Sequence, residues 1–244
     1  MRFKALVEYE GTAYYGFQRQ IDEQPTIQGE LEKTLSQLAA VPITVRGAGR
    51  TDSGVHAWGQ VISFDLDWQH EVAALERALN ANLPKDIAVY HLEQVHERFH
   101  PRYDARRRTY EYHIYNQPNR SPLRRFRSWQ VAQPLDMAKM NEAAALLIGT
   151  QDFATFGRSP QGNNTVRELF QAQWRRESEL LIFTIEANAF LYRMVRTIVG
   201  TLQQVGSGRW TVEQFRQVFQ AKKRSQAAAL APPHGLYLMS ITYE

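Results

Sequence analysis

Apolar and polar side chains alternate over residues 3–9, a period of two that predicts a strand. Apolar residues then recur every three to four positions from Ile27 to Leu38, which is typical of a helix. Continued along the first half, these two periods predict the order strand, helix, strand, strand, helix, strand. The segments are residues 3–9, 27–38, 41–46, 59–66, 72–79 and 86–92.

The second half repeats this order and adds one short helix near its end, over residues 211–220. Its six main segments are residues 107–115, 135–148, 165–174, 179–187, 189–205 and 235–243. The order is that of the ferredoxin-like unit, whose four-stranded sheet also underlies a common RNA-recognition module. We therefore expect an α+β protein with two similar halves, residues 1–105 and 106–244, and a cleft between them.

The composition of the 244 residues, 43% hydrophobic and 22% charged, is that of an ordinary globular protein. Without an apolar run near ~20 residues or a signal-peptide core, we expect a cytoplasmic protein that does not enter a membrane. The cysteine count is 0, which excludes disulfides, thiolate zinc sites, iron–sulfur clusters and a cysteine nucleophile.

Positive charge is concentrated in one segment. Residues 98–127 hold nine Arg, no Lys and two carboxylates, for a net charge of +7 in a chain whose total is +4. Guanidinium groups match phosphate geometry and stay charged, so nucleic acid is the first partner to consider. A solvated charged face is the alternative interpretation.

The motif with the most specific chemistry is GAGRTDSGVH, residues 47–56, between two predicted strands. Its three glycines permit positive φ angles and a close approach of the backbone to a ligand. It lacks the Gly-Lys-Ser/Thr of a P-loop, and no helix follows it as in a dinucleotide fingerprint. It offers one carboxylate, Asp52, with Arg50 two residues before it. An ordinary Asp-Ser-Gly turn is the competing interpretation.

A possible zinc motif needs separate consideration. His96, Glu97 and His100 form a literal H-E-x-x-H, which on a helix would place two imidazoles on one face. Pro101 follows directly and leaves little length for a helix, and the third ligand would have to be His113 or Glu111 on a predicted strand. We therefore favour a turn here and expect no metal site.

Two further segments suggest RNA contacts. Tyr110 and Tyr112 alternate on a strand directly after Arg106, Arg107 and Arg108, an arrangement that suits base stacking beside phosphate neutralisation. A plain core strand is the alternative. The predicted helix over 189–205 places two arginines inside an apolar stretch, where each would need either an anion or a solvent-exposed head group: Arg193 and Arg196.

The loop GAGRTDSGVHA closely resembles the catalytic loop of the TruA family of tRNA pseudouridine synthases. The likeness continues in order through YYGFQRQ, ALNANLP, FHPRYDARRRTYEYHIYN, NAFLYRMVRTIVGTL and APPHGLYLMSITY, so it spans essentially the whole chain. It implies a two-domain fold around one extended, mixed and mainly antiparallel sheet, and a homodimer. It also implies isomerisation of uridine to pseudouridine at positions 38 to 40 of the tRNA anticodon stem and loop.

The resemblance also implies roles for single residues. Asp52 matches the catalytic aspartate, and Arg50 the side chain that helps hold the flipped nucleotide. Tyr110 is similar to the tyrosine that stacks on the target uracil, Arg196 to the arginine that pairs with the aspartate, and Leu236 to the apolar residue that closes the pocket. RNA contacts are expected from four arginines near the middle of the chain: Arg102, Arg106, Arg107 and Arg108.

Two positions depart from the family pattern and put details of specificity in doubt. Gln151 stands where a His is expected, and Pro101 replaces a small residue.

The implied reaction agrees with the residues present. Isomerising uridine exchanges the C1′–N1 bond for a C1′–C5 bond without redox change, so no cofactor is expected. A carboxylate can act as nucleophile or as base, and a nearby Arg would keep it ionised; the residues leave open which role Asp52 takes. A base within a paired stem must first be extruded. A non-catalytic RNA-binding protein and a zinc hydrolase using His96 and His100 are the alternative functions.

Overall fold

The computed structural model describes residues 1–20, 24–160 and 162–243. This part of the chain forms ten strands and five α-helices in two compact units. Unit 1 comprises Met1–Arg106 and Tyr237–Glu244, and unit 2 comprises Arg107–Leu236. The last strand thus groups with unit 1, although the sequence assigns it to the second half. The functional division at residues 105 and 106 stays a prediction.

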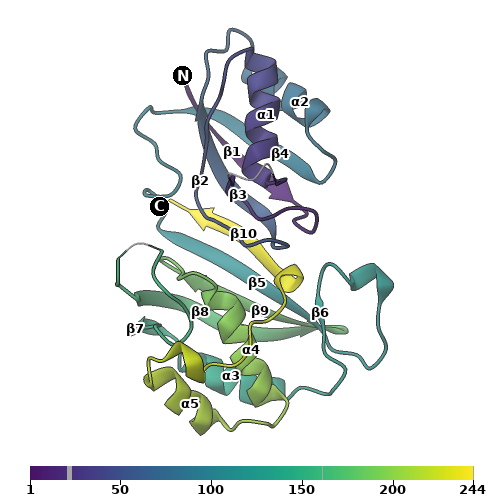
Figure 1. Ribbon diagram of the computed structural model, residues 1–244, viewed down its shortest axis with the longest axis vertical. Helices are drawn as coiled ribbons and strands as arrows, with labels where there is room; N and C mark the ends of the chain where they lie inside the picture. Colours follow the sequence, from purple (N-terminus) through teal and green to yellow (C-terminus); the bar gives the residue numbers. More distant parts are fainter. Residues whose placement is uncertain (21–23, 161, 244) are drawn as a thin grey trace. The chain divides into compact units, whose positions relative to one another are not determined.

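The sheet of unit 1 is built around β1 (Arg2–Tyr9), which lies between β4 (Ile87–Val95) and β3 (His56–Asp65) and is antiparallel to both (Figure 1). The short strand β2 (Val45–Gly47) pairs antiparallel with β3. On the chain's return, β10 (Leu236–Thr242) pairs parallel with β3 through Tyr237 and Leu238.

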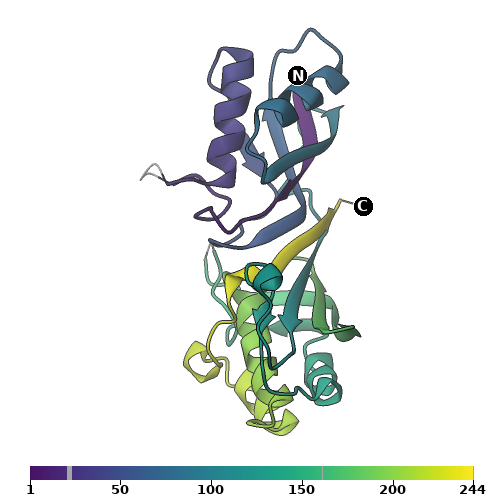
Figure 2. The same ribbon diagram turned by 90° about the vertical axis from the view of Figure 1, so that its right-hand side faces the viewer.

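Two helices supply the rest of the core of unit 1. Helix α1 (Ile27–Ala39) begins after Thr26, whose hydroxyl accepts the N–H of Gly29 at 3.2 Å. Helix α2 (Val72–Asn82) buries Leu75 and Leu79. Figures 1 and 2 show both helices against the sheet. The buried side chains of β1, at every second position, complete this core.

Unit 2 has a second sheet in which β9 (Leu180–Ala187) lies between β5 (Arg107–Tyr115) and β8 (Val166–Glu177), antiparallel to both. Strand β7 (Gly149–Asp152) extends it antiparallel to β8, and β6 (Trp129–Gln130) pairs parallel with β5. The helices are α3 (Met137–Ala145), α4 (Met194–Gly206) and α5 (Val212–Gln220). Three short 3-10 turns are η1 (Pro122–Arg124), η2 (Arg224–Gln226) and η3 (Pro233–Gly235).

The predicted α+β class, with mainly antiparallel pairing, is confirmed. The sequence missed β6 and β7 because each is too short to show a period. The predicted start of α4 at residue 189 is wrong, since Arg193 has a left-handed φ of 62° and the helix begins at Met194. Within the described ranges, no helix combines the length and apolar character that crossing a bilayer requires.

Candidate active site

Residues 48–55, here called the Asp52 loop, connect β2 to β3 at one end of the unit 1 sheet. Arg50 is exposed, Thr51 is buried and Asp52 is half-buried. The loop closes in a turn in which the N–H of Val55 donates to the carbonyl of Asp52 at 3.2 Å. Gly54 in this turn has a φ of 76°, which residues with a Cβ rarely adopt. The carboxylate of Asp52 therefore projects from a defined turn.

The segment after β1 holds the Asp52 loop from one side. The hydroxyls of Tyr9 and Thr51 are hydrogen-bonded at 2.8 Å, and the N–H of Phe17 donates to the carbonyl of Thr51 at 3.2 Å. The N–H of Gly54 and the hydroxyl of Ser53 both donate to one carbonyl, that of Tyr14, at 3.3 and 3.1 Å. These bonds fix the backbone on both sides of Asp52.

Gly16 makes this close approach possible. Its φ is 94°, and a Cβ added there would lie 2.6 Å from the carbonyl oxygen of Thr51. The glycine of the YYGFQRQ segment is therefore required by backbone geometry and by space.

Gln60 holds the loop from the strand side. Its side chain is completely buried, with 0% exposure. Its amide NH₂ donates to the carbonyl of Gly49 at 2.8 Å, and its amide oxygen accepts the N–H of Gly49 at 3.2 Å. One side chain thus satisfies both backbone groups of a residue three positions before Asp52.

Sequence reasoning missed Gln60, although a signal was present. Ile62 and Phe64 lie on one face of the predicted strand, and a period of two places Gln60 on that same buried face. A polar residue there needs hydrogen-bond partners, and the adjacent loop is where it finds them.

His56 and Tyr14 are two other buried polar side chains near the loop. The Nδ1 atom of His56 accepts the N–H of Gly11 at 3.0 Å, and its ring stacks on Tyr237 with centroids 4.8 Å apart. The hydroxyl of Tyr14 donates to Asp86 at 2.6 Å. Burial, together with this carboxylate, raises the pKa of Tyr14 well above its usual value of 10. Tyr14 therefore stays a neutral hydrogen-bond donor.

Three further predicted site residues lie in unit 2, namely Tyr110, Leu236 and Arg196. Tyr110, on β5, is 8% exposed, and its ring meets Phe190 edge to face with centroids 5.0 Å apart. Leu236, also buried, follows the η3 turn at the start of β10. The stacking and pocket-closing roles of these two side chains stay predictions.

Arg196 is half-buried in the first turn of α4, and its Nε donates to the carbonyl of Ala231 at 2.8 Å. Burial raises the pKa of Tyr112 well above 10, and the positive charge of Arg196 opposes that rise. Arg193, expected inside the apolar helix, is exposed at the helix start, with its guanidinium 4.7 Å from the ring centroid of Tyr192. The pairing of Arg196 with Asp52 stays a prediction.

The predicted RNA-contacting arginines have unequal surroundings. Arg102 is half-buried with its guanidinium 5.7 Å from the Tyr103 ring centroid, and Arg106 is exposed. Arg107 forms an ion pair with Glu186 at 2.9 Å. Arg108 donates to the carbonyl of Asn188 at 2.7 Å. Arg107 therefore offers less uncompensated charge than a count of arginines suggests.

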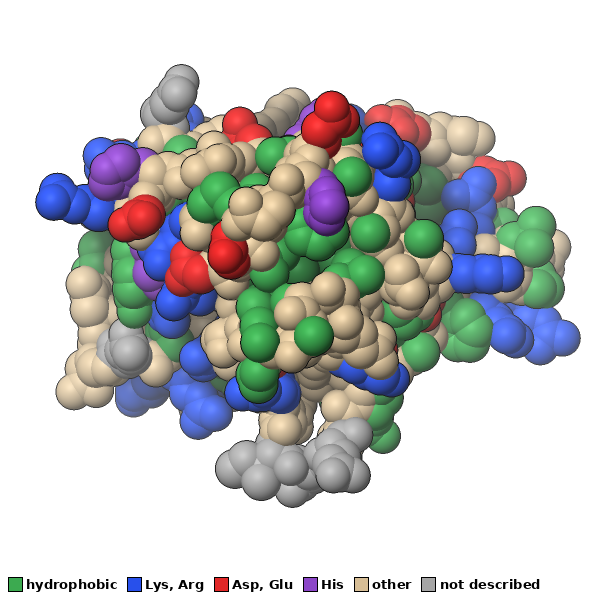
Figure 3. Space-filling view, turned by 90° about the horizontal axis from the view of Figure 1, so that it is seen from above, with side chains coloured by type: hydrophobic (Ala, Val, Ile, Leu, Met, Phe, Trp, Pro, Cys, Tyr) green, Lys and Arg blue, Asp and Glu red, His purple; other side chains and the backbone are tan. Residues whose placement is uncertain are grey.

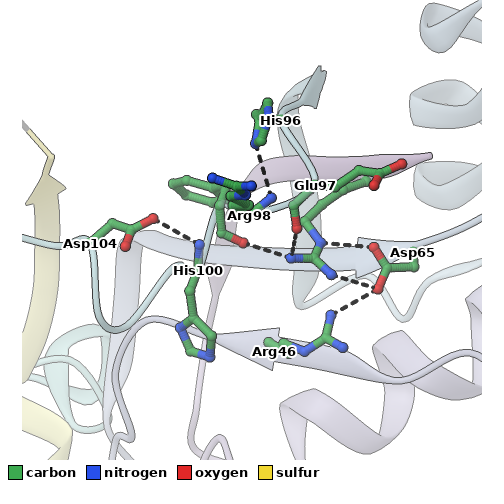
Figure 4. A network of polar contacts seen from close by, with 9 residues as sticks. Arg46, Asp65, His96, Glu97, Arg98, His100 and Asp104 are labelled. Carbon is green, nitrogen blue, oxygen red and sulfur yellow. Dashed lines mark hydrogen bonds and ion pairs between the residues drawn. The ribbon is translucent and has the colours of Figure 1, made fainter.

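The H-E-x-x-H segment contains no helix and forms turns. His96 accepts the N–H of Arg98 through Nδ1 at 3.1 Å, and His100 accepts the N–H of Arg102 in the same way at 3.1 Å. The two imidazoles point away from one another (Figure 4). The described residues include no group of three or more side chains suited to a metal ion.

The two positions that depart from the family pattern have structural contacts. The amide of Gln151 donates to the carbonyls of Leu146 and Ile148 at 2.8 and 2.9 Å, just after α3. The carbonyl of Pro101 accepts the hydroxyl of Tyr243 at 2.9 Å. Gln151 therefore stabilises the backbone that follows α3, whereas the carbonyl of Pro101 contacts a residue 142 positions later in the chain.

A protein-family model described as tRNA pseudouridine synthase matches residues 5–104 and 143–244. The chain belongs to the tRNA pseudouridine synthase family. It is accordingly an enzyme of the isomerase class that acts on RNA, as the loop motif predicted.

Among curated proteins similar to this pseudouridine synthase are several named tRNA pseudouridine synthase A. That of Methylacidiphilum infernorum is 40% identical, covering 99% of this chain and 95% of the relative. Those of Shewanella piezotolerans and Neisseria meningitidis are 43% and 42% identical, covering 100% and 99% of this chain and 93% and 92% of the relatives. A chain from the "Crystal Structure of a Cbf5-Nop10-Gar1 Complex" has a TM-score of 0.37 at 9% identity, covering 96% of this chain and 57% of that one.

Proposed function

We propose that this chain converts uridine to pseudouridine at positions 38, 39 and 40 of the tRNA anticodon stem and loop, with Asp52 as the catalytic residue. It acts as a homodimer in the cytoplasm and uses neither a metal ion nor an organic cofactor. The relatives named tRNA pseudouridine synthase A support the choice of tRNA.

The observation that carries this proposal is the fixed position of Asp52. Its loop is hydrogen-bonded to Tyr9, Tyr14 and Phe17 on one side and to Gln60 on the other. A loop whose backbone is held this way around Asp52 needs little reorganisation when the substrate arrives. A protein that only bound RNA would gain nothing from a negative charge facing phosphates.

The reaction is balanced without an external reactant. The C1′–N1 bond breaks, the base turns, and a C1′–C5 bond forms. The proton on C5 leaves to water and N1 takes up a proton. Asp52 assists as nucleophile or base while Arg50 holds the extruded nucleotide outside the stem.

Three residues of unit 2 complete the proposed machinery. Tyr110 provides an aromatic face for the extruded uracil, Leu236 provides apolar contact with that base, and Arg196 pairs with the Asp52 carboxylate. Arg102 and Arg106 to Arg108 bind phosphates along the RNA.

The test is tritium release from a tRNA transcript labelled at C5 of uridine, because forming the C1′–C5 bond must expel that hydrogen. We expect release from tRNA with uridines at positions 38 to 40, and none when these are replaced by cytidine. Release unaffected by that replacement would contradict the proposed positions, and no release from any tRNA would contradict the activity.

Asp52→Asn is the matched variant, since the amide has the same shape and the loop glycines are unchanged. We expect it to abolish turnover while tRNA affinity stays within about a few-fold, because no phosphate-binding group is lost. More than a tenth of the wild-type turnover would exclude Asp52 as the catalytic group.

A further inference from the structure

Residues 116–128 form a loop between β5 and β6 that the proposed reaction does not use. We call this segment the arginine loop, because it contains Arg120, Arg124, Arg125 and Arg127 and no Asp or Glu. At the right-hand edge of Figure 3, where Figure 1 places this loop, Lys and Arg side chains alternate with hydrophobic ones.

The arginine loop has a defined backbone. The N–H groups of Arg124 and Arg127 donate to the carbonyls of Ser121 and Arg124 at 3.1 and 2.9 Å. At its base, the side chain of Asn116 donates to the carbonyls of Val131 and Gln133 at 3.0 and 2.8 Å. A loop ordered in this way loses little conformational entropy on binding a partner.

The ordered loop exposes apolar side chains that do not contribute to the core. Leu123 is 91% exposed and Phe126 is 45% exposed. The guanidinium of Arg125 lies 4.3 Å from the Phe126 ring centroid, so charge and apolar surface are presented together. Such exposure has no folding benefit, and therefore points to a partner.

The chemistry of the loop identifies RNA as that partner. Arginines neutralise phosphates, and exposed leucine or phenylalanine side chains pack against unstacked bases and sugars. A symmetric contact with a second copy of the loop would bring two clusters of four arginines together, with no carboxylate in either loop to compensate.

We propose that the arginine loop is an additional tRNA-binding element, with Arg120, Arg125 and Arg127 on phosphates and Leu123 and Phe126 against a base or sugar. Arg124 has a mainly structural role, because it lies 3.8 Å from Glu179 and its guanidinium is 5.5 Å from the Tyr115 ring centroid. The inference rests on the proposed function in taking tRNA as the ligand.

The test compares two triple variants that remove equal charge. Arg120→Gln, Arg125→Gln and Arg127→Gln alter the loop, whereas Lys33→Gln, Arg77→Gln and Lys85→Gln alter exposed residues of unit 1. Binding of unmodified tRNA is measured by filter retention between low and moderate salt. We expect the loop variant to reduce the slope of log affinity against log salt by roughly two units, at 0.7 to 0.9 per phosphate contact. The control should change it by less than one unit.

Leu123→Asp tests the apolar part, with Leu123→Met as the conservative control. We expect the aspartate variant to bind tRNA at least several-fold more weakly, while its thermal midpoint stays at the wild-type value. The methionine variant should bind normally.

Equal salt slopes in the two triple variants would overturn the proposal. Normal tRNA binding by Leu123→Asp would also overturn it. So would a difference in molecular mass, by light scattering, between RNA-free Leu123→Asp and RNA-free wild-type protein, because such a difference would make the loop a contact between subunits. Because binding is measured directly, failure of the loop to bind is distinguishable from failure of wild-type protein to release tritium.

Discussion

Gln60 offers the sharpest perturbation of the proposed active site, because it acts on the Asp52 loop without touching substrate. Gln60→Leu removes both hydrogen bonds to Gly49, at 2.8 and 3.2 Å, from a fully buried position. Each such bond contributes about 1 kcal/mol, and because Gly49 is half-buried, its unpaired N–H and carbonyl cost less than the roughly 1 to 3 kcal/mol of a fully buried group. We expect the free energy of unfolding to fall by about 2 to 4 kcal/mol.

Gln60→Glu separates positioning of the loop from simple loss of stability. A protonated glutamate donates one O–H and accepts through its carbonyl oxygen, as the glutamine amide does toward Gly49. An ionised glutamate can only accept, and would repel the carbonyl of Gly49. Burial disfavours the charged form, so the pKa of the introduced carboxyl should lie above the ordinary glutamate value of about 4.3.

The sign of the pH dependence follows from that raised pKa. Relative to wild type, Gln60→Glu should be nearly as stable below about pH 4.3, and should lose stability as pH rises through the raised pKa. Its single-turnover tritium release, as a fraction of the wild-type rate at each pH, should likewise fall from pH 5 to 8. A misplacement of about 1 Å at the reacting group can cost roughly a hundredfold in rate.

Ser63→Ala is the matched control on the same strand. Ser63 is 0% exposed, and its hydroxyl has no hydrogen-bond partner within the described ranges, so its loss should leave turnover unchanged. Wild-type turnover in Gln60→Leu, or a rate ratio for Gln60→Glu that does not vary with pH, would refute the positioning role.

The remaining predictions concern unit 2 and the RNA contacts. Tyr110→Phe should bind tRNA near normally but turn over poorly if the hydroxyl moves the C5 proton, and full activity of this variant would reject the proton-transfer role. Tyr110→Leu should lose about 1 to 3 kcal/mol of stacking, and normal tRNA binding by this variant would reject the stacking role. Neutralising Arg106, Arg107 and Arg108 together should reduce the salt dependence of tRNA affinity, with the smallest share from Arg107. An unchanged slope of log affinity against log salt would show that these three arginines form only a solvated charged face. A hydrogen bond from His113 and the charge of Arg175 lower the pKa of Glu111 from 4.5 to about 2. Glu111 should therefore stabilise the fold above about pH 4.5, by at most about 3 kcal/mol, and this contribution should disappear toward pH 2. The stability of Glu111→Gln should not show this loss between about pH 4.5 and pH 2. Identical acid-unfolding curves for the variant and the wild type would contradict the stabilising role of Glu111.

The sequence predicted elements best where local chemistry sets their ends. Helix α1 runs over Ile27–Ala39, close to the predicted residues 27–38, because Thr26 caps its first turn. The start of α4 could not be predicted in the same way, since nothing local to Arg193 demands a left-handed conformation. The isolated bridge between Arg158 and Tyr192, 34 positions apart, accompanies that irregular start.

The candidate site was predictable only in part, for a related reason. Asp52 and Arg50 could be chosen from their loop because glycines and one carboxylate already distinguish it. The contacts that hold the loop come from Tyr9, Tyr14 and Phe17, which are about 40 residues away in sequence. Such long-range pairing is decided by the fold.

The contacts that fix the Asp52 loop also differ in kind from those that stabilise the core. The core is mainly apolar, and the free energy of unfolding lost when a core side chain is truncated scales with the apolar area that is no longer buried. The loop depends on a few hydrogen bonds and on backbone angles at Gly16 and Gly54, with φ of 94° and 76°. Losing two or three of these hydrogen bonds removes a large fraction of a marginal folding free energy, and it also removes the precision that a reacting carboxylate requires. Substitutions at Gln60 or Gly16 should therefore lower turnover as well as stability.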